Sequence, residues 1–181
     1  MKRLLITFCF FSTISLSAQK FYTKTGTTEF KASVEAFEPV EATSKSTTAI
    51  LNTATGEIAA LIFVKSFHFD VALMEEHFNE NYLDTKDFPK ATFKGKLQNF
   101  ELSKLSSSWV EYKMIGTLRI RGVDTAINDV INIKKAGDKI IVKGLIIISP
   151  SDFKIEIPRA VSSKISNKIK VIINYELVEK K

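Results

Sequence analysis

Two histidines and a group of carboxylates are the side chains whose types most resemble catalytic or metal-binding chemistry. His68 and His77 are nine residues apart, and Glu75, Glu76 and Glu80 flank His77. A metal pair on a helix takes ligands four residues apart, and no third ligand follows at a matching spacing. Carboxylates that act as a catalytic pair are buried at a fixed separation, whereas these three fall on the polar side of one predicted helix. The sequence therefore predicts no catalytic site and no metal site.

His77 has two interpretations. It lies beside Met74 and Phe78, where a histidine is more often a hydrogen-bonded wall residue than a general base. The sequence contains no Gly-x-Ser-x-Gly turn, phosphate loop or dinucleotide fingerprint. We therefore expect a protein that is not an enzyme. The alternative, an enzyme that acts on a lipid, would need a buried polar cluster around His77.

The segment 66–95 must position these side chains, and its apolar period changes twice. Large apolar residues alternate over 67–69, recur at three- and four-residue spacing over 71–82, and return to a period of two over 88–93. This pattern predicts one helix between two strands. A lone helix among strands must bury its apolar stripe against another part of the molecule.

Short apolar runs separated by turn residues make up the chain after residue 19. The runs are rich in Phe, Ile, Val and Thr, as strands are, and no linker, repeat or low-complexity segment interrupts them. We therefore expect a single domain over 20–181. The predicted strands are 20–25, 28–37, 47–52, 57–69, 90–102, 109–121, 125–135, 139–149 and 167–178, with a short helical turn between 158 and 166.

Eight or nine antiparallel strands with tight connections predict an all-β fold, either a closed barrel or a sandwich. Residues 28–34 alternate between apolar and polar, as in a sheet with one solvent-exposed face. Residues 58–64 and 140–148 are apolar on both faces and need cover on both sides. That cover is either the helix outside and a core or bound apolar molecule inside, or a well-packed two-layer core.

The first 19 residues have the pattern of a secretory signal peptide. Lys2 and Arg3 form a positive start, residues 4–11 are almost wholly apolar, and small residues follow up to Ala18. The apolar run is shorter than the roughly 20 residues that cross a bilayer, so we expect no stable transmembrane anchor. Cleavage is predicted between Ser17 and Gln19, which places the mature protein in the periplasm or outside the cell.

Cysteine content and charge narrow the functional classes further. Cys9, the only cysteine, lies inside the predicted signal peptide, so the mature chain carries no thiol and no disulfide. Removing Lys2 and Arg3 lowers the formal net charge from +6 to +4, and the remaining lysines are spread along the chain. A nucleic-acid-binding protein usually has a dense basic face with aromatic platforms. We therefore expect no nucleic-acid partner.

An ordered set of short motifs resembles the YceI-like family of periplasmic polyisoprenoid- or lipid-binding proteins. The resemblance covers essentially the whole mature chain. The motifs are Ser66-Phe67-x-Phe69, Leu73-Met74-x-x-His77-Phe78, Tyr82-Leu83-Asp84, Phe88-Pro89-x-Ala91-x-Phe93-x-Gly95, Gly116-Thr117-Leu118-x-Ile120-x-Gly122-Val123 and Asp152-Phe153-x-Ile155-x-Ile157-Pro158. The resemblance implies a lipocalin-like antiparallel barrel of about eight strands with one main helix, whose pore holds an isoprenoid chain.

One segment departs from the family pattern. Many members read Leu-Thr-Ile-His-Gly where this chain reads Leu118-Arg119-Ile120-Arg121-Gly122. The two arginines share one strand face, where they either bind a ligand's phosphate or carboxylate or face solvent. The second interpretation is favoured because Leu118 and Ile120 then point inward.

A prenyl or acyl chain needs apolar area more than directional bonds, because burial gains roughly 25 cal/mol per Å². Methionines would let the wall adapt to an irregular chain, and tyrosine and histidine would offer polar tips near an opening. Each expected residue is alternatively a plain core residue. The expected ligand-binding residues are Phe67, Phe69, Met74, His77, Phe78, Tyr82, Phe93, Trp109, Met114, Leu118 and Ile120.

Two functional classes remain open at this point. The first is a carrier that holds an isoprenoid, quinone or acyl lipid for transport, storage or sequestration, with no other cofactor. The second is a ligandless barrel, filled by its own aromatic residues, that acts through a protein partner. An exposed apolar strand face would also allow a homodimer.

Overall fold

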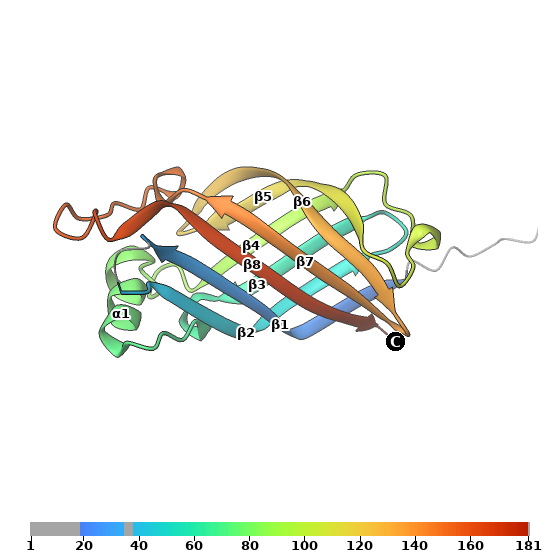
Figure 1. Cartoon of the computed structure of the whole chain (residues 1–181), viewed down its shortest axis with the longest axis horizontal. Coiled ribbons are helices and arrows are strands. Elements are labelled where there is room, and N and C mark those ends of the chain that lie inside the picture. Colours follow the sequence, from blue (N-terminus) through green and yellow to red (C-terminus); the bar gives the residue numbers. More distant parts are fainter. Residues whose placement is uncertain (1–18, 35–37, 181) are drawn as a thin grey trace, which may run out of the picture.

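The computed structural model describes residues 19–34 and 38–180, and eight of its strands close into one antiparallel barrel (Figure 1). Each strand pairs with its sequence neighbours, and the last pairs with the first. The strands are β1 (Lys20–Ser33), β2 (Glu41–Asn52), β3 (Glu57–Phe63), β4 (Lys90–Leu97), β5 (Val110–Ile120), β6 (Val123–Ala136), β7 (Lys139–Ile148) and β8 (Ile165–Glu179). The predicted all-β barrel of about eight strands with one main helix is confirmed.

Several predicted strand boundaries were wrong. Strand β3 ends at Phe63 instead of residue 69, because the helical turn Val64–Ser66 follows it. Strand β4 ends at Leu97 instead of residue 102, because the chain turns at Asn99 with a φ of 54°.

The predicted strands 20–25 and 28–37 form one strand, β1, whose register with β2 shifts on either side of Gly26. The expected end at Phe37 lies outside the described residues. Strand β2 begins at Glu41 instead of residue 47, because its polar start alternates faces and places Ala42 and Ser44 inside the barrel.

The helical segment is short and changes geometry within the predicted range 71–82. Helix α1 (Ala72–His77) continues into the π-helical turn η2 (Phe78–Tyr82). The Asn79 side chain donates a hydrogen bond to the Glu75 carbonyl at 2.8 Å, and the Leu83 N–H bonds to the carbonyl of Phe78, five residues earlier. Short 3-10 turns, η1 (Val64–Ser66), η3 (Leu102–Lys104) and η4 (Pro150–Phe153), complete the set. Residues 159–164 form turns without a helix.

The two ends of the barrel are filled differently. The main core cluster includes Leu51, Leu97, Ile133, Ile140 and Leu177, all almost completely buried. Leu177 is two residues from the end of β8 and pairs with Ile140, so this cluster lies toward the end of the barrel that carries the carboxyl terminus (Figure 1). Helix α1 and the connection from η4 to β8 lie at the opposite end. We call the first the closed end and the second the mouth.

The expectation that the doubly apolar strands are covered on both faces was wrong. The helix lies at the mouth rather than over the outer face of β3, where Phe63 is 52% exposed. Leu145 and Ile147 of β7 are also exposed on the outer surface. Among residues 19–34 and 38–180, no helix is long and apolar enough to cross a membrane. The predicted signal peptide falls almost entirely on residues 1–18, which lie outside the described residues.

Candidate functional site

An apolar cavity of about 480 Å³ occupies the mouth half of the barrel. This volume lies within the range of about 300–1,000 Å³ that is common for small-molecule sites. All eight strands line the cavity, although β2 contributes only Thr47 and β6 only Ile127. The other lining residues come from α1, from the helical turns and from the loops beside them. The exposed residue His77 lies on the rim, so the cavity reaches the surface there.

Four phenylalanine rings form one wall of the cavity. The rings of Phe30 and Phe78 stack with centroids 5.1 Å apart, and Phe67 meets Phe30 edge-on at 5.3 Å. Phe69 contacts both Phe30 and Phe78. Phe30 comes from β1, while the other rings come from the segment around α1. This aromatic cluster therefore attaches the helical segment to the barrel. The expected apolar stripe is only partly covered, because Leu73 on the same helix is 57% exposed.

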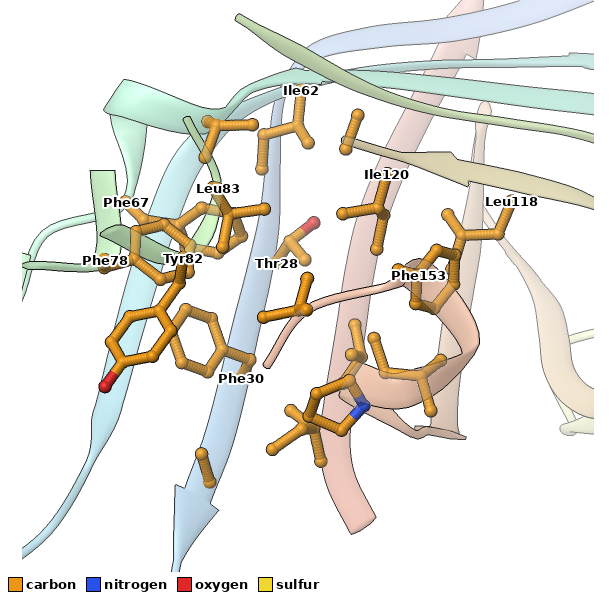
Figure 2. Close-up of a pocket in the computed structure, with 18 of the residues that line it drawn as sticks. Thr28, Phe30, Ile62, Phe67, Phe78, Tyr82, Leu83, Leu118, Ile120 and Phe153 are labelled. Atoms are coloured by element: carbon orange, nitrogen blue, oxygen red, sulfur yellow. The ribbon is translucent and has the colours of Figure 1, made fainter. Parts of the chain in front are cut away.

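The facing wall is aliphatic and comes from the other side of the barrel. Figure 2 shows Leu118, Ile120 and Phe153 across the cavity from Phe67 and Phe78. Leu118 and Ile120 belong to β5, and Phe153 of η4 is almost fully buried. The two walls are apolar along their length, so they suit a chain without polar groups.

Phe93 lines the cavity because two glycines leave room for its ring. Gly95 of β4 pairs with Gly116 of β5, and both positions face the barrel interior. A Cβ atom at Gly95 or Gly116 would lie 2.5 or 2.6 Å from Phe93 Cζ, much closer than side chains pack. The missing side chains therefore keep the Phe93 ring against the wall and leave the centre of the cavity open.

A cluster of three hydroxyl groups lies at the inner end of the cavity, next to the core of the closed end. The Thr28 hydroxyl is 2.8 Å from the Thr47 hydroxyl and 3.0 Å from the Tyr175 hydroxyl. All three residues line the cavity and are buried. Burial raises the pKa of Tyr175, while its hydrogen bonds to Thr28 and Thr47 act in the opposite direction.

The mouth carries most of the remaining polarity. Among the described residues that line the cavity, Glu38 and Lys164 are the ones with a formal charge, and both adjoin the mouth ends of β1 and β8. His77 and Tyr82 lie on the helical side of the same opening. An apolar ligand with a polar head would therefore meet polar groups at the mouth or at the hydroxyl cluster, and apolar side chains between them.

The structure brings ten of the eleven predicted ligand-binding residues together around this cavity. They are Phe67, Phe69, Met74, His77, Phe78, Tyr82, Phe93, Met114, Leu118 and Ile120. Their role in binding a ligand stays a prediction.

Trp109 is the exception, and its placement in the pore was wrong. On β5 the inward side chains are those of Tyr112, Met114 and Leu118, so an odd-numbered residue faces out. Trp109 is 42% exposed, and the ammonium group of Lys134 lies 4.7 Å from its ring centroid.

The two arginines of the departing motif face the outer surface, as the favoured interpretation predicted. Arg119 binds Asp124 with a two-pronged contact, Nε to Oδ1 at 2.7 Å and Nη2 to Oδ2 at 3.1 Å. Arg121 donates to the carbonyl of Lys154 at 3.1 Å. Neither arginine lines the cavity.

The potential catalytic groups do not converge. The side chain of His68 is 77% exposed, and its Nδ1 atom lies 3.8 Å from Glu75 Oε2. The same Glu75 oxygen accepts a hydrogen bond from the Phe69 N–H at 3.2 Å, so it fixes the turn before α1. Within residues 19–34 and 38–180, no three His, Cys, Asp or Glu side chains are placed to hold a metal ion.

Sequence reasoning missed the wall that β8 and β1 contribute. Val171, Ile173 and Tyr175 of β8 line the cavity, as do Thr28 and Phe30 of β1. A signal was present, because these residues alternate at a period of two within their strands. In a closed barrel every strand presents one face inward. The alternation that identified the inward residues of β5 would therefore also have identified those of β1 and β8.

The family of the chain follows from a comparison of its sequence with protein-family models. The model of the YceI-like domain matches residues 12–177. The chain belongs to the YceI-like family. This confirms the resemblance that the motifs indicated. Among curated proteins, none matches the sequence.

Solved structures share the fold of this YceI-like chain. A polyisoprenoid binding domain from Saccharophagus degradans, implicated in plant cell wall breakdown, is 16% identical with a TM-score of 0.74, and the match covers 90% of this chain and 99% of that domain. BcnA of Burkholderia cenocepacia is 18% identical with a TM-score of 0.68, covering 84% and 96%. The YCEI protein of Campylobacter jejuni is 22% identical with a TM-score of 0.61, covering 80% and 87%. At these identities the likeness shows the fold.

Proposed function

We propose that this YceI-like protein is a non-catalytic binding protein that holds an elongated apolar ligand inside its barrel. The observation that carries the proposal is the apolar cavity of about 480 Å³ at the mouth. Each 100 Å² of apolar ligand surface buried there would contribute about 2.5 kcal/mol. The candidate ligands are isoprenoids, quinones and acyl lipids, and the fold shared with a polyisoprenoid binding domain supports this class.

The hydroxyl cluster favours a ligand that carries an oxygen atom at its inner end. The Thr28, Thr47 and Tyr175 hydroxyls hydrogen-bond to one another, and a hydroxyl group can also exchange a hydrogen bond with a ligand oxygen. A quinone carbonyl or an ester would supply such an oxygen at this end of the cavity, whereas a plain hydrocarbon end would not.

The proposed role is transport, storage or sequestration of such a molecule across water. Residues 1–19 have the composition of a signal peptide, and an apolar chain cannot cross an aqueous periplasm without a carrier. We therefore infer that the mature protein begins near Gln19 and works in the periplasm or outside the cell. Protein sequencing of the mature amino terminus would test this inference.

Extraction of the native protein with organic solvent, followed by mass spectrometry, tests the ligand directly. We expect about one apolar lipid molecule per barrel. Extracts without lipid from repeated preparations would overturn the proposal and favour a ligandless barrel that acts through a protein partner.

A matched pair of variants on β3 shows whether such a lipid lies in the cavity. Ala60 faces the cavity, whereas its neighbour Ala59 faces outward. Ala60→Phe fills part of the cavity, so we expect it to lose most of the extracted lipid. Ala59→Phe adds the same side chain on the outer surface of the barrel, so this variant should retain the lipid. Equal lipid content in two folded variants would place the lipid elsewhere on the protein.

A further inference from the structure

The outer surface of β5 to β8 carries apolar side chains that the cavity does not use. Trp109, Ile115, Val130, Leu145 and Ile147 are each 40–50% exposed. They point outward because their strand neighbours, such as Met114, Ile131 and Ile146, point into the barrel.

Strand pairing brings these side chains together. Val130 and Leu145 lie just beyond the last paired residues of β6 and β7, Ile131 and Gly144. On the other side of β6, Val130 pairs with Lys113, which is two residues from Ile115 on the same face of β5. Ile147 is two residues from Leu145 on β7. Ile115, Val130, Leu145 and Ile147 therefore form one patch across three neighbouring strands. Trp109 lies at its edge, because its ring centre is 5.5 Å from the ammonium group of Lys143, which is two residues from Leu145 on β7.

Lysines surround this patch. Lys96 pairs with Ile115, Lys113 pairs with Val130, and Lys170 pairs with Ile147. Lys134 and Lys143 place their ammonium groups 4.7 and 5.5 Å from the centre of the Trp109 ring. Within the part of the chain that the structure describes, none of these five lysines forms an ion pair with a carboxylate. We call the patch and its five lysines the lysine-rimmed face.

Acidic residues gather elsewhere, around the helical segment at the mouth. A polar groove there is lined by five carboxylates against two lysines: Asp70, Glu75, Glu76, Glu80 and Asp84 against Lys65 and Lys86. Among the carboxylates on the lysine-rimmed strands, Glu111 is two residues from Lys113 on β5, Glu176 of β8 forms an ion pair with Lys139, and Asp129 accepts a hydrogen bond from the Val130 N–H. The protein therefore has one cationic apolar side and one acidic end.

We propose that the lysine-rimmed face docks on an anionic phospholipid surface. Each lysine near an anionic membrane surface contributes about 1 kcal/mol of binding free energy. The alkyl part of a lysine side chain can cover apolar surface, and tryptophan favours the boundary between headgroups and acyl chains. A second copy of the chain is a poorer occupant, because a two-fold contact would bring lysines against lysines. The inference goes beyond the proposed function and does not depend on it.

Vesicle binding tests the proposal with the full mature chain. Trp109 is the only tryptophan, so its fluorescence reports this face alone. We expect binding to phosphatidylglycerol vesicles with a blue shift of the Trp109 emission, weaker binding in high salt, and little binding to pure phosphatidylcholine. Absence of binding to the anionic vesicles would overturn the proposal. So would a blue shift without vesicles that follows protein concentration, because it would identify a second copy as the occupant.

Charge-reversed variants separate this face from the net charge. Lys113→Glu with Lys143→Glu should weaken binding to phosphatidylglycerol vesicles by about tenfold or more. Lys65→Glu with Lys86→Glu changes the net charge equally but at the acidic end, and should weaken binding far less. Equal losses would mean that total charge, not the lysine-rimmed face, governs binding. Ala60→Phe should bind vesicles like the wild type even if it carries no lipid, which keeps a failure here distinct from a failure of the proposed function.

Discussion

At the scale of single residues, Tyr175 joins the filled and the hollow parts of the barrel. Its ring packs over Gly26, where a Cβ atom would lie 2.6 Å from Tyr175 Cδ1, and its hydroxyl reaches Thr28. The ring belongs to the core cluster, while the hydroxyl lines the cavity. A buried phenol of this kind is stable only in its neutral form.

Alkaline pH should therefore destabilise the protein through Tyr175. Burial raises its pKa above the ordinary tyrosine value of about 10, so the unfolded chain loses this proton first as the pH rises. The stabilising contribution is complete below about pH 10 and is lost as the pH climbs toward the folded pKa. Tyr175→Phe should make the fall in unfolding free energy above pH 10 less steep, as measured by denaturant titration at several pH values. Tyr112, whose pKa burial also raises, remains in both proteins. An unchanged slope would show that Tyr175 ionises freely.

The alternation of inward and outward side chains along a strand explains which cavity residues of β5 were predicted correctly and which one was not. The period of two correctly grouped Met114, Leu118 and Ile120 on one face of β5. Trp109 was wrongly grouped with them, because its odd number places it on the other face. The hydroxyl cluster was not predictable, because Thr28, Thr47 and Tyr175 are far apart in sequence and meet only when β1 closes the barrel.

At the scale of elements, the helical segment depends on its aromatic contacts. Helix α1 has six residues, fewer than an isolated helix needs to be stable in water. Phe78, at the start of η2, contacts Phe30, Phe67 and Phe69. The helix itself contains no buried residue. The stability of the segment therefore comes from the aromatic cluster more than from the helix.

Removing the Phe78 ring should loosen this segment while the barrel stays folded. We expect Phe78→Ala to cost about 2–3 kcal/mol in local stability, since Phe78 is only partly buried. Hydrogen exchange followed by mass spectrometry should show faster exchange over 72–85 and little change in β5 to β8. Leu73→Ala on the same helix is the control, because Leu73 is 57% exposed. Uniformly faster exchange in every strand would mean that the segment and the barrel unfold as one unit.

The period of the sequence predicted the existence of this element, but not its ends or its geometry. The three- and four-residue spacing over 71–82 matches α1 and η2 together. The change to π geometry is accompanied by a hydrogen bond from the Asn79 amide to the Glu75 carbonyl, a contact that apolar periodicity does not describe. Strand β2 shows the converse, because the polar residues at its start concealed the first six residues of a strand that was predicted only over 47–52.

At the scale of the whole molecule, the cavity predicts that ligand and stability are linked. A molecule that binds the folded barrel and not the unfolded chain stabilises the fold by about 2.7 kcal/mol at a concentration one hundred times its dissociation constant. Protein as purified should therefore resist guanidinium better than the same protein after lipid extraction and refolding. Ala60→Phe should show little difference between the two preparations. If wild-type protein shows no difference either, the cavity holds no ligand that matters for stability.

The unequal filling of the two ends also bears on how this barrel can change over evolutionary time. Substitutions in the packed closed end, around Leu51 and Ile133, disturb neighbours on every side. A side chain such as Leu118 or Ile120 faces open space on one side, so a change in its size strains few neighbours. The closed end can therefore maintain the fold while residues at the mouth change to fit different ligands. A change in the size of Leu118 or Ile120 should accordingly alter which molecule fits the cavity more than it alters the stability of the barrel.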